Sequence, residues 1–243
     1  MKNLIILLLL LFSVSVVSAQ SIIRAQPFYT SPTGAIPVWT NLISCWPMIE
    51  TSGGIAYDVS PTGDNATVTG ATQTANGVVF DGTSGNYLTI STPAFGTADF
   101  TIILIINPTA TSSPFYRNIL FGPTNSFLWS LYVNRRPRAL ITGGGGSTPT
   151  SITLTYGVEN MLAVVRSGNN FRFFINGSFE TQAYTADFTA GLDEIGGYQN
   201  STYLAFLGTM RNIFIFDDAK ADSYITAFYN SGSYTDYADG DPE

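Results

Sequence analysis

The sequence predicts an all-β fold of antiparallel strands, and three observations carry this prediction. Only 11% of the 243 residues are charged, well below the roughly 25% usual in globular domains. The 23 glycines and the many threonines and serines suit short strands joined by frequent turns. Residues 160–177 have the pattern of two strands joined by a Gly-Asn-Asn turn, and they end in Asn176-Gly177, which favours a tight hairpin turn. A third strand over 178–183 is therefore expected to fold back at once.

The first 19 residues have the layout of a secretory signal peptide. A positive start at Lys2 precedes an apolar run over residues 4–17, and Val17-Ser18-Ala19 places the expected cleavage after Ala19. That run is shorter than the roughly 20 residues that a membrane-spanning helix needs, so we expect no stable membrane span after cleavage. The sequence thus predicts a protein that is secreted, extracellular or held at the cell surface.

The rest of the chain divides by composition into three parts. Residues 20–40 are rich in Pro, Ser and Thr and are expected to form an extended leader. Residues 41–232 contain the strand signals and are predicted to form one sandwich domain, since all-β domains of about 200 residues commonly have a single core. Residues 233–243 are acidic and are expected to form a disordered tail.

Apolar runs of strand length recur through this domain. Besides the hairpin, strands are expected at 78–80, 87–90, 100–106, 118–121, 127–133 and 138–142. Alternate residues in the fifth run are apolar, which places on one face Phe127, Trp129, Leu131 and Val133. Residues 101–106 are apolar almost throughout and predict a strand covered on both sides. Helical spacing is found at 222–230, with Gly232 as the stop.

Several motifs follow one another along the domain. They comprise residues 42–50 with the Asp58-Val59-Ser60 turn, Val79-Phe80-Asp81-Gly82 with 86–90, the strand 100–108, the hairpin 161–177, Ile195-Gly196-Gly197 and the strand 208–216. In this order they resemble the concanavalin A-like lectin/glucanase superfamily, specifically the bacterial laminin-G-like domains. The resemblance implies an antiparallel two-sheet jelly-roll sandwich with one short C-terminal helix.

The chain departs from the resembled pattern at three places. Arg211-Asn212 stands where an acidic pair is usual, and Asn160-Met161 stands where a Trp-His pair is usual. Ala221 replaces the usual serine at the start of the helix, which removes a side-chain cap. The fold is expected to survive these changes, whereas the function of a typical member does not transfer automatically.

Charge and residue inventory exclude several function classes. A formal charge of −7 and a pI near 4.4 argue against nucleic acid as a partner, and the cluster Arg135, Arg136 and Arg138 is interpreted as a solvated turn. The chain has no histidine, which excludes serine-type triads and histidine-based metal sites. Cys45 is the single cysteine, so no internal disulfide forms, and a buried apolar role is preferred.

The carboxylates argue against an enzyme. The resemblance implies that a hydrolase of this superfamily would carry a Glu-x-Asp-x-(x)-Glu signature along one strand, and this chain has none. Asp193 and Glu194 are adjacent, so a regular strand would point them to opposite faces. We therefore predict no catalytic residues and regard a glycoside hydrolase as the disfavoured alternative.

Sugar binding is the preferred function, because the resemblance places ligands on rim loops or on one sheet. Aromatic rings stack on sugar rings, and amides bond hydroxyl groups, which makes the loop 198–203 the best candidate through Tyr198, Asn200 and Tyr203. Trp129 is the strand candidate. Packing in the core is the alternative interpretation of such aromatic residues.

The resemblance also implies a Ca²⁺ ion held by loop oxygens. Asp58, Asp64 and Asp81 lie in predicted turns and offer the hard oxygen ligands that Ca²⁺ needs. Aspartates in turns commonly bond the nearby backbone instead.

Two functions from different classes remain at this point. The first is a secreted, non-catalytic binding or adhesion module, whose partner is a glycan or a surface protein. The second is a structural component of a cell-surface or virion-type assembly, in which the sandwich packs as a homo-oligomer or within a larger assembly.

Overall fold

The computed structural model describes residues 39–231, except for 84, 110–116, 123–126, 133–134, 142–149, 184, 186–187 and 198–204. The chain divides into two units, Met1–Ile36 and Pro37–Glu243, and all described residues lie in the second. The predicted signal peptide and acidic tail, and nearly all of the predicted leader, therefore lie outside the described residues.

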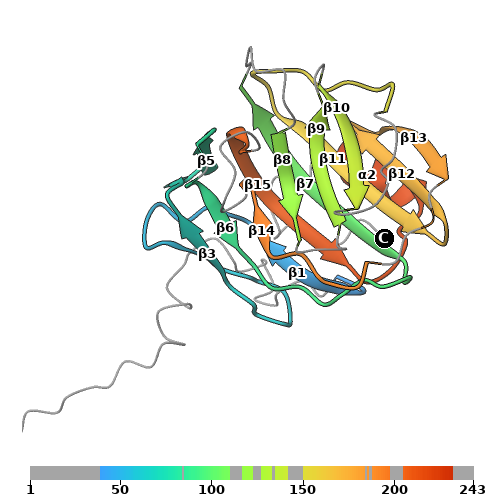
Figure 1. Ribbon diagram of the computed structural model, residues 1–243, viewed down its shortest axis with the longest axis horizontal. Coiled ribbons are helices and arrows are strands. Elements are labelled where there is room, and N and C mark those ends of the chain that lie inside the picture. Colours follow the sequence, from blue (N-terminus) through green and yellow to red (C-terminus); the bar gives the residue numbers. More distant parts are fainter. Residues whose placement is uncertain are drawn as a thin grey trace, which may run out of the picture. The chain divides into compact units, whose positions relative to one another are not determined.

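The first of two antiparallel sheets has eight strands in the order β13-β12-β11-β7-β15-β5-β4, with β1 beside β15 (Figure 1). Its strands are β1 (Leu42–Trp46), β4 (Thr72–Thr74), β5 (Gly77–Asp81), β7 (Phe100–Pro108), β11 (Asn160–Ser167), β12 (Asn170–Ile175), β13 (Ser178–Ala183) and β15 (Leu207–Phe216). Strand β15 is shared: its first half pairs with β5, and its second half pairs with β1. The change of partner coincides with a register shift and a positive φ of 50° at Asn212.

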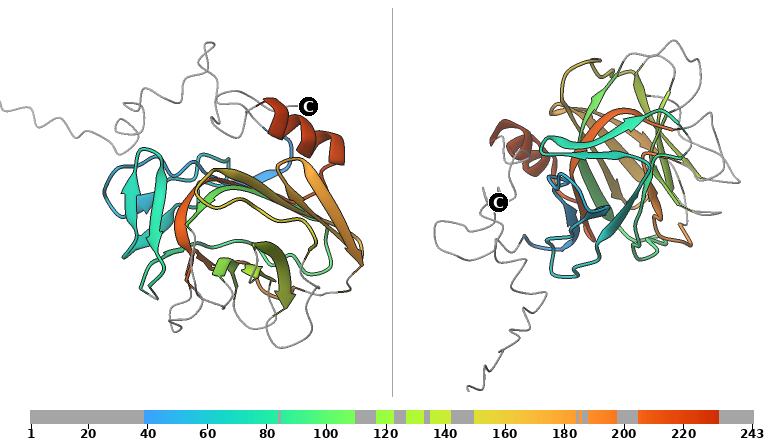
Figure 2. Two further views of the ribbon diagram at one scale, coloured as in Figure 1. Left: turned by 90° about the horizontal axis from the view of Figure 1, so that it is seen from above. Right: turned by 90° about the vertical axis from the view of Figure 1, so that its left-hand side faces the viewer.

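The second sheet has seven strands in the order β10-β9-β8-β14-β6-β3-β2. Its strands are β2 (Ile55–Ala56), β3 (Ala66–Thr69), β6 (Tyr87–Thr89), β8 (Arg117–Phe121), β9 (Phe127–Tyr132), β10 (Arg136–Ile141) and β14 (Glu194–Ile195). Figure 2 shows the two sheets face to face, with the helix α2 (Asp222–Ser231) on the far side of the eight-stranded sheet. The layers are therefore helix, sheet and sheet.

Strand β7 shows why this layering follows from the sequence. Its alternate residues Ile102, Leu104 and Ile106 belong to the core between the sheets. Ile103 and Ile105 point the other way and pack in a second core beneath α2. A strand covered on both faces must be apolar throughout, which confirms the prediction for residues 101–106.

The β12–β13 turn behaves as its residues require. Asn176 and Gly177 have φ angles of 49° and 78°, the left-handed region that a two-residue hairpin turn demands. The Asn176 carboxamide oxygen also accepts a hydrogen bond from the Met161 amide at 2.8 Å. The meander β11-β12-β13 pairs without a register shift, so the predicted hairpin and third strand are confirmed.

The fold class is the predicted one, an all-β, two-sheet sandwich with one C-terminal helix among the described residues. Cys45 is fully buried, as expected, and burial raises the pKa of its thiol. The predicted strand 138–142 begins two residues earlier than expected, because Arg136 and Pro137 pair with Tyr132 and Leu131.

Candidate functional site: the outer face of the seven-stranded sheet

One outer face of the sandwich is closed by packing. Beneath α2, the ring of Trp39 stacks on Phe214 with centroids 4.9 Å apart and meets Phe228 edge-on at 5.4 Å. Such aromatic pairs add to the burial of apolar area. The eight-stranded sheet is therefore covered on its outer side over its central strands, and this region serves stability.

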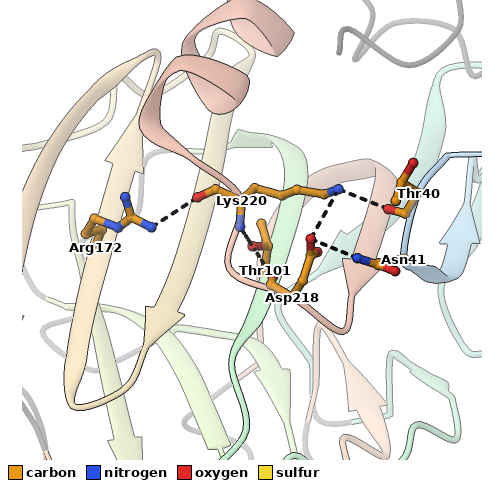
Figure 3. A network of polar contacts seen from close by, with 6 residues as sticks. All are labelled: Thr40, Asn41, Thr101, Arg172, Asp218 and Lys220. Carbon is orange, nitrogen blue, oxygen red and sulfur yellow. Dashed lines mark hydrogen bonds and ion pairs between the residues drawn. The ribbon is translucent and has the colours of Figure 1, made fainter.

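A buried lysine, Lys220, contacts the residues on either side of α2's connection to the eight-stranded sheet (Figure 3). The Lys220 side chain is 3% exposed, and its Nζ donates to the Thr40 carbonyl at 3.0 Å and lies 3.5 Å from Asp218 Oδ2. The same Nζ lies 4.8 Å from the ring centroids of both Phe216 and Tyr224.

The main chain of Lys220 completes the network. Its amide donates to Thr101 Oγ1 at 2.9 Å, and its carbonyl accepts from Arg172 at 3.0 Å. Asn41 Nδ2 donates to Asp218 Oδ2 at 3.0 Å. Residues just before β1, from β7 and from β12 thus meet at the connection from β15 to α2. Lys220 could not be predicted from the sequence, because none of these partners is near it in the sequence apart from Asp218.

The outer face of the seven-stranded sheet is different, and the strand register identifies its residues. Trp129, Leu131 and Ile195 belong to the core between the sheets. Side chains alternate along a strand, and directly paired residues share a face. The outward positions therefore include the pair Arg138–Ser130 and the row Glu194–Thr89–Thr67.

Unpaired donors gather on β9 and β10. Ser130 is fully buried, and its hydroxyl has no hydrogen-bond partner in the described part of the chain. Arg138 lies directly opposite, and Arg136 is on the same face two residues along β10. Arg136 Nε is likewise buried without a partner among the described residues. Buried donors are almost always hydrogen-bonded in folded proteins, so these two positions lack an acceptor.

Acidic groups are scarce on this face. Glu194, which is 5% exposed, is the single acidic residue in the described strands of the seven-stranded sheet. Burial raises the pKa of the neighbouring Asp193, but Asp193 precedes the strand. Glycosidases use two carboxyl groups about 5–9.5 Å apart across the bond that they cleave. The described strands of this sheet supply one carboxyl group, that of Glu194.

The predicted sugar-binding residues fall into two groups. Tyr198, Asn200 and Tyr203 lie outside the described residues, in the segment that follows Gly197, and their role stays a prediction. Trp129 is fully buried in the core between the sheets. Its ring has no exposed face on which a sugar could stack, so its position supports the alternative interpretation of core packing.

The three aspartates predicted to hold Ca²⁺ do not form a common site. Asp58 is 8% exposed, and its carboxylate accepts from the amides of Cys45 and Ser60 at 2.8 Å. The same carboxylate accepts from the Thr62 hydroxyl and the Asp64 amide at 3.1 Å. With four donors on its two oxygens, Asp58 has little capacity left for a cation.

Asp64 and Asp81 serve their own turns. The Asp64 carbonyl accepts from Trp46 Nε1 at 2.9 Å, and its side chain is exposed. The exposed Asp81 carboxylate accepts from the Thr83 amide at 2.8 Å. Hydrogen bonds from the side chain and amide of Thr83 lower the pKa of Asp81. Within the described residues, no group of three acidic or cysteine side chains lies close enough together to hold a metal ion.

Comparison with known proteins identifies the family. The family model of the concanavalin A-like lectin/glucanases superfamily matches residues 80–226, more than half of the chain. The chain belongs to this superfamily. No curated protein matches the sequence.

Solved structures share the fold at low identity. The sialidase of Trypanosoma rangeli is 19% identical with a TM-score of 0.61, and the match covers 82% of this chain and 34% of the sialidase chain. The binding domain of Paraclostridial Mosquitocidal Protein 1 is 14% identical with a TM-score of 0.63, covering 79% of this chain and 52% of that one. The chain thus spans about a third of the sialidase and about half of the binding domain. At these identities the likeness concerns the fold.

Proposed function

We propose that this protein is a non-catalytic carbohydrate-binding module whose ligand lies on the outer face of the seven-stranded sheet. The carrying observation is the fully buried Ser130 hydroxyl, which lacks a partner among the described residues and lies opposite Arg138 on an outward-facing position. Sugar hydroxyls can both accept and donate hydrogen bonds, so they suit this mixture of serine, arginine and the threonines at 67 and 89. Membership of a superfamily of lectins and glucanases supports the same assignment.

The absence of catalysis is part of the proposal. A paired-carboxylate mechanism needs an acid and a nucleophile or base, and Glu194 is alone in the described strands of this sheet. The Asp193 carboxyl has its pKa raised by burial, as a general acid would require, but its Oδ1 is buried. We expect that glycans bound by the protein are recovered intact after prolonged incubation.

A glycan array tests the binding face. The wild-type protein is compared with Ser130→Ala and Arg138→Gln, and with Arg211→Gln as the matched control. Arg211 belongs to the other sheet, where it pairs with Glu159 at 2.8 Å. We expect the first two variants to lose retention at least tenfold while the control keeps it. Equal retention by all four folded proteins would overturn the assignment to this face, and no retention by the wild type would overturn carbohydrate binding.

The same glycan array also tests the predicted roles of the loop 198–203 and of Ca²⁺. Replacing Tyr198 and Tyr203 by alanine is expected to weaken retention if the loop borders the bound glycan. A chelator is expected to leave retention and melting temperature unchanged, because the Asp58 carboxylate already accepts four hydrogen bonds. A fall in melting temperature with the chelator would instead support the calcium prediction.

Secretion completes the proposed role. The described part of the chain contains no helix with the length and apolar character needed to span a bilayer. We propose that residues 1–19 direct export and are then removed, which the mass of the protein recovered outside the cell would test. Glycan-negative multimers in light scattering would favour the structural-assembly alternative.

A further inference from the structure

We infer that the glycan bound by this face carries an anionic group, a carboxylate or a sulfate, which is recognised by Arg136 and Arg138. The inference rests on the proposed carbohydrate-binding function and specifies its ligand class. An anionic ligand is unexpected for a protein whose formal net charge is −7. The local balance on β9 and β10 is the opposite, because these two described strands carry two arginines and no acidic residue.

Two hydrogen-bond donors on these strands bear on the choice of ligand. Arg136 Nε and the Ser130 hydroxyl are both buried, and neither has a partner among the described residues. The arginine side chain has donors only, and the proton of a serine hydroxyl without an acceptor makes no hydrogen bond. Leaving such donors unpaired is costly. A ligand that brings oxygen acceptors would therefore gain more here than a ligand that brings donors.

The acidic side chain whose pKa Arg136 affects is already engaged by other donors. Glu180, on β13, accepts from the amide and the hydroxyl of Ser151, each at 2.6 Å, and from Gln182 Nε2 at 3.2 Å. Burial works to raise the pKa of Glu180, but hydrogen bonds from Ser151 and Gln182 and the charge of Arg136 together lower it. Arg136 therefore lies close enough for its charge to affect the pKa of Glu180. The carboxylate oxygens of Glu180 already accept hydrogen bonds from other donors.

Arginine chemistry explains the choice of ligand class. The planar guanidinium offers paired donors that match the two oxygens of a carboxylate or a sulfate. Arg136 and Arg138 lie on the same face of one strand, opposite Tyr132 and Ser130, and both side chains are partly exposed. Glu194, the single acidic residue in the described strands of this sheet, lies on β14 and is separated from β10 by β9 and β8.

Matched pairs of probes test the inference by calorimetry. One pair is an oligogalacturonate and its methyl ester, and the other is a sulfated galactan oligosaccharide and its desulfated form. We expect at least one anionic member to bind tenfold or more tightly than its neutral counterpart, with affinity falling as salt is raised. The stronger pair tells whether the group is a carboxylate or a sulfate.

Variants locate the preference on the protein. The double variant Arg136→Gln/Arg138→Gln should reduce the preference to below threefold, whereas Arg211→Gln should keep it. Should the double variant fold poorly, Arg136→Lys/Arg138→Lys keeps the charge but loses the paired donors, and an intermediate preference is expected. Equal binding of neutral and anionic members, or a preference that survives in the double variant, would overturn the inference. If glycans bind without a charge preference, the inference about anionic glycans is wrong but the proposed carbohydrate-binding function is retained. If no glycan binds, both the inference and the proposed function are wrong.

Discussion

Asp58 shows how a single side chain can organise a loop. Its carboxylate joins the amide of Cys45 on β1 to Ser60, Thr62 and Asp64 in the turn that follows. A carboxylate can only accept, so it suits four converging donors. An amide would turn its own donor group toward some of them.

We therefore expect Asp58→Asn to lower the free energy of unfolding by about 1–3 kcal/mol, the usual cost of an unsatisfied buried group. Urea unfolding measures this. Asp64→Asn is the control, because the exposed side chain of Asp64 is not used in the network and its change should stay within about 0.5 kcal/mol. Equal effects of the two changes would refute the role given to Asp58.

Glu50 makes the stability depend on pH in a defined direction. Burial raises the pKa of its carboxyl above 4.5, although the Tyr57 amide donates to Oε1 at 3.0 Å. The folded protein then binds a proton more readily than the unfolded chain, so this group destabilises the fold once the pH exceeds its raised pKa. As the pH falls through that pKa toward 4.5, the penalty disappears.

The free energy of unfolding of Glu50→Gln, taken relative to the wild type, should therefore be higher at pH 7 than at pH 4. Asp81→Asn should show the opposite trend, because hydrogen bonds from Thr83 lower the pKa of Asp81 and its stabilisation is lost in acid. Urea titrations between pH 3 and pH 7 compare the two variants. Parallel pH profiles for both variants would contradict the assignment.

At this scale the sequence predicted apolar residues better than buried charges. The alternation in 127–133 correctly placed Trp129 and Leu131 on the inner face. Lys220 and Arg166 are 3% and 1% exposed, yet nothing local marks them as buried. Arg166 donates to the carbonyl of Gly96 at 2.7 Å, a partner that only the folded chain brings near.

Among the elements, α2 depends on tertiary contacts more than on its own cap. Ala221 precedes the helix and offers no capping oxygen. Asp222 in the first turn is paired with Arg172 of β12. Lys220, which precedes Ala221, donates a hydrogen bond from its Nζ to the Thr40 carbonyl. The helix therefore relies on this network and on the second core.

Lys220→Met retains most of the apolar side chain but removes the bond to the Thr40 carbonyl and the charge between two rings. We expect a loss of about 1–3 kcal/mol in the free energy of unfolding, with faster amide exchange in α2. Arg211→Met is the matched control, since it also removes a charge but its partner Glu159 is 47% exposed, so a smaller loss than that of Lys220→Met is expected. Unchanged exchange in α2 would show that the lysine is dispensable.

Elements with local signals were predictable, and those set by distant partners were not. The turn at Asn176-Gly177 follows from residues that accept a positive φ. The register shift at Asn212 and the switch of β15 from β5 to β1 depend on where other strands lie. The pairing Arg138–Ser130, on which the candidate site rests, likewise comes from the folded sheet.

For the whole molecule, the proposed function rests on the difference between the two outer faces of the sandwich. One face is covered over its central strands by α2 and the aromatic cluster around Trp39. The other carries Arg136, Arg138 and Ser130, and two of its buried donors, Arg136 Nε and the Ser130 hydroxyl, have no partner among the described residues. The resemblance predicted the sandwich, which the structure confirms, and the face assigned to a ligand is our proposal.

Hydrogen exchange with and without a glycan retained on the array tests this claim most directly. We expect the bound glycan to slow amide exchange in β8, β9 and β10 and to leave exchange in α2 unchanged. Slowed exchange confined to α2, or to the outer side of the eight-stranded sheet, would contradict it.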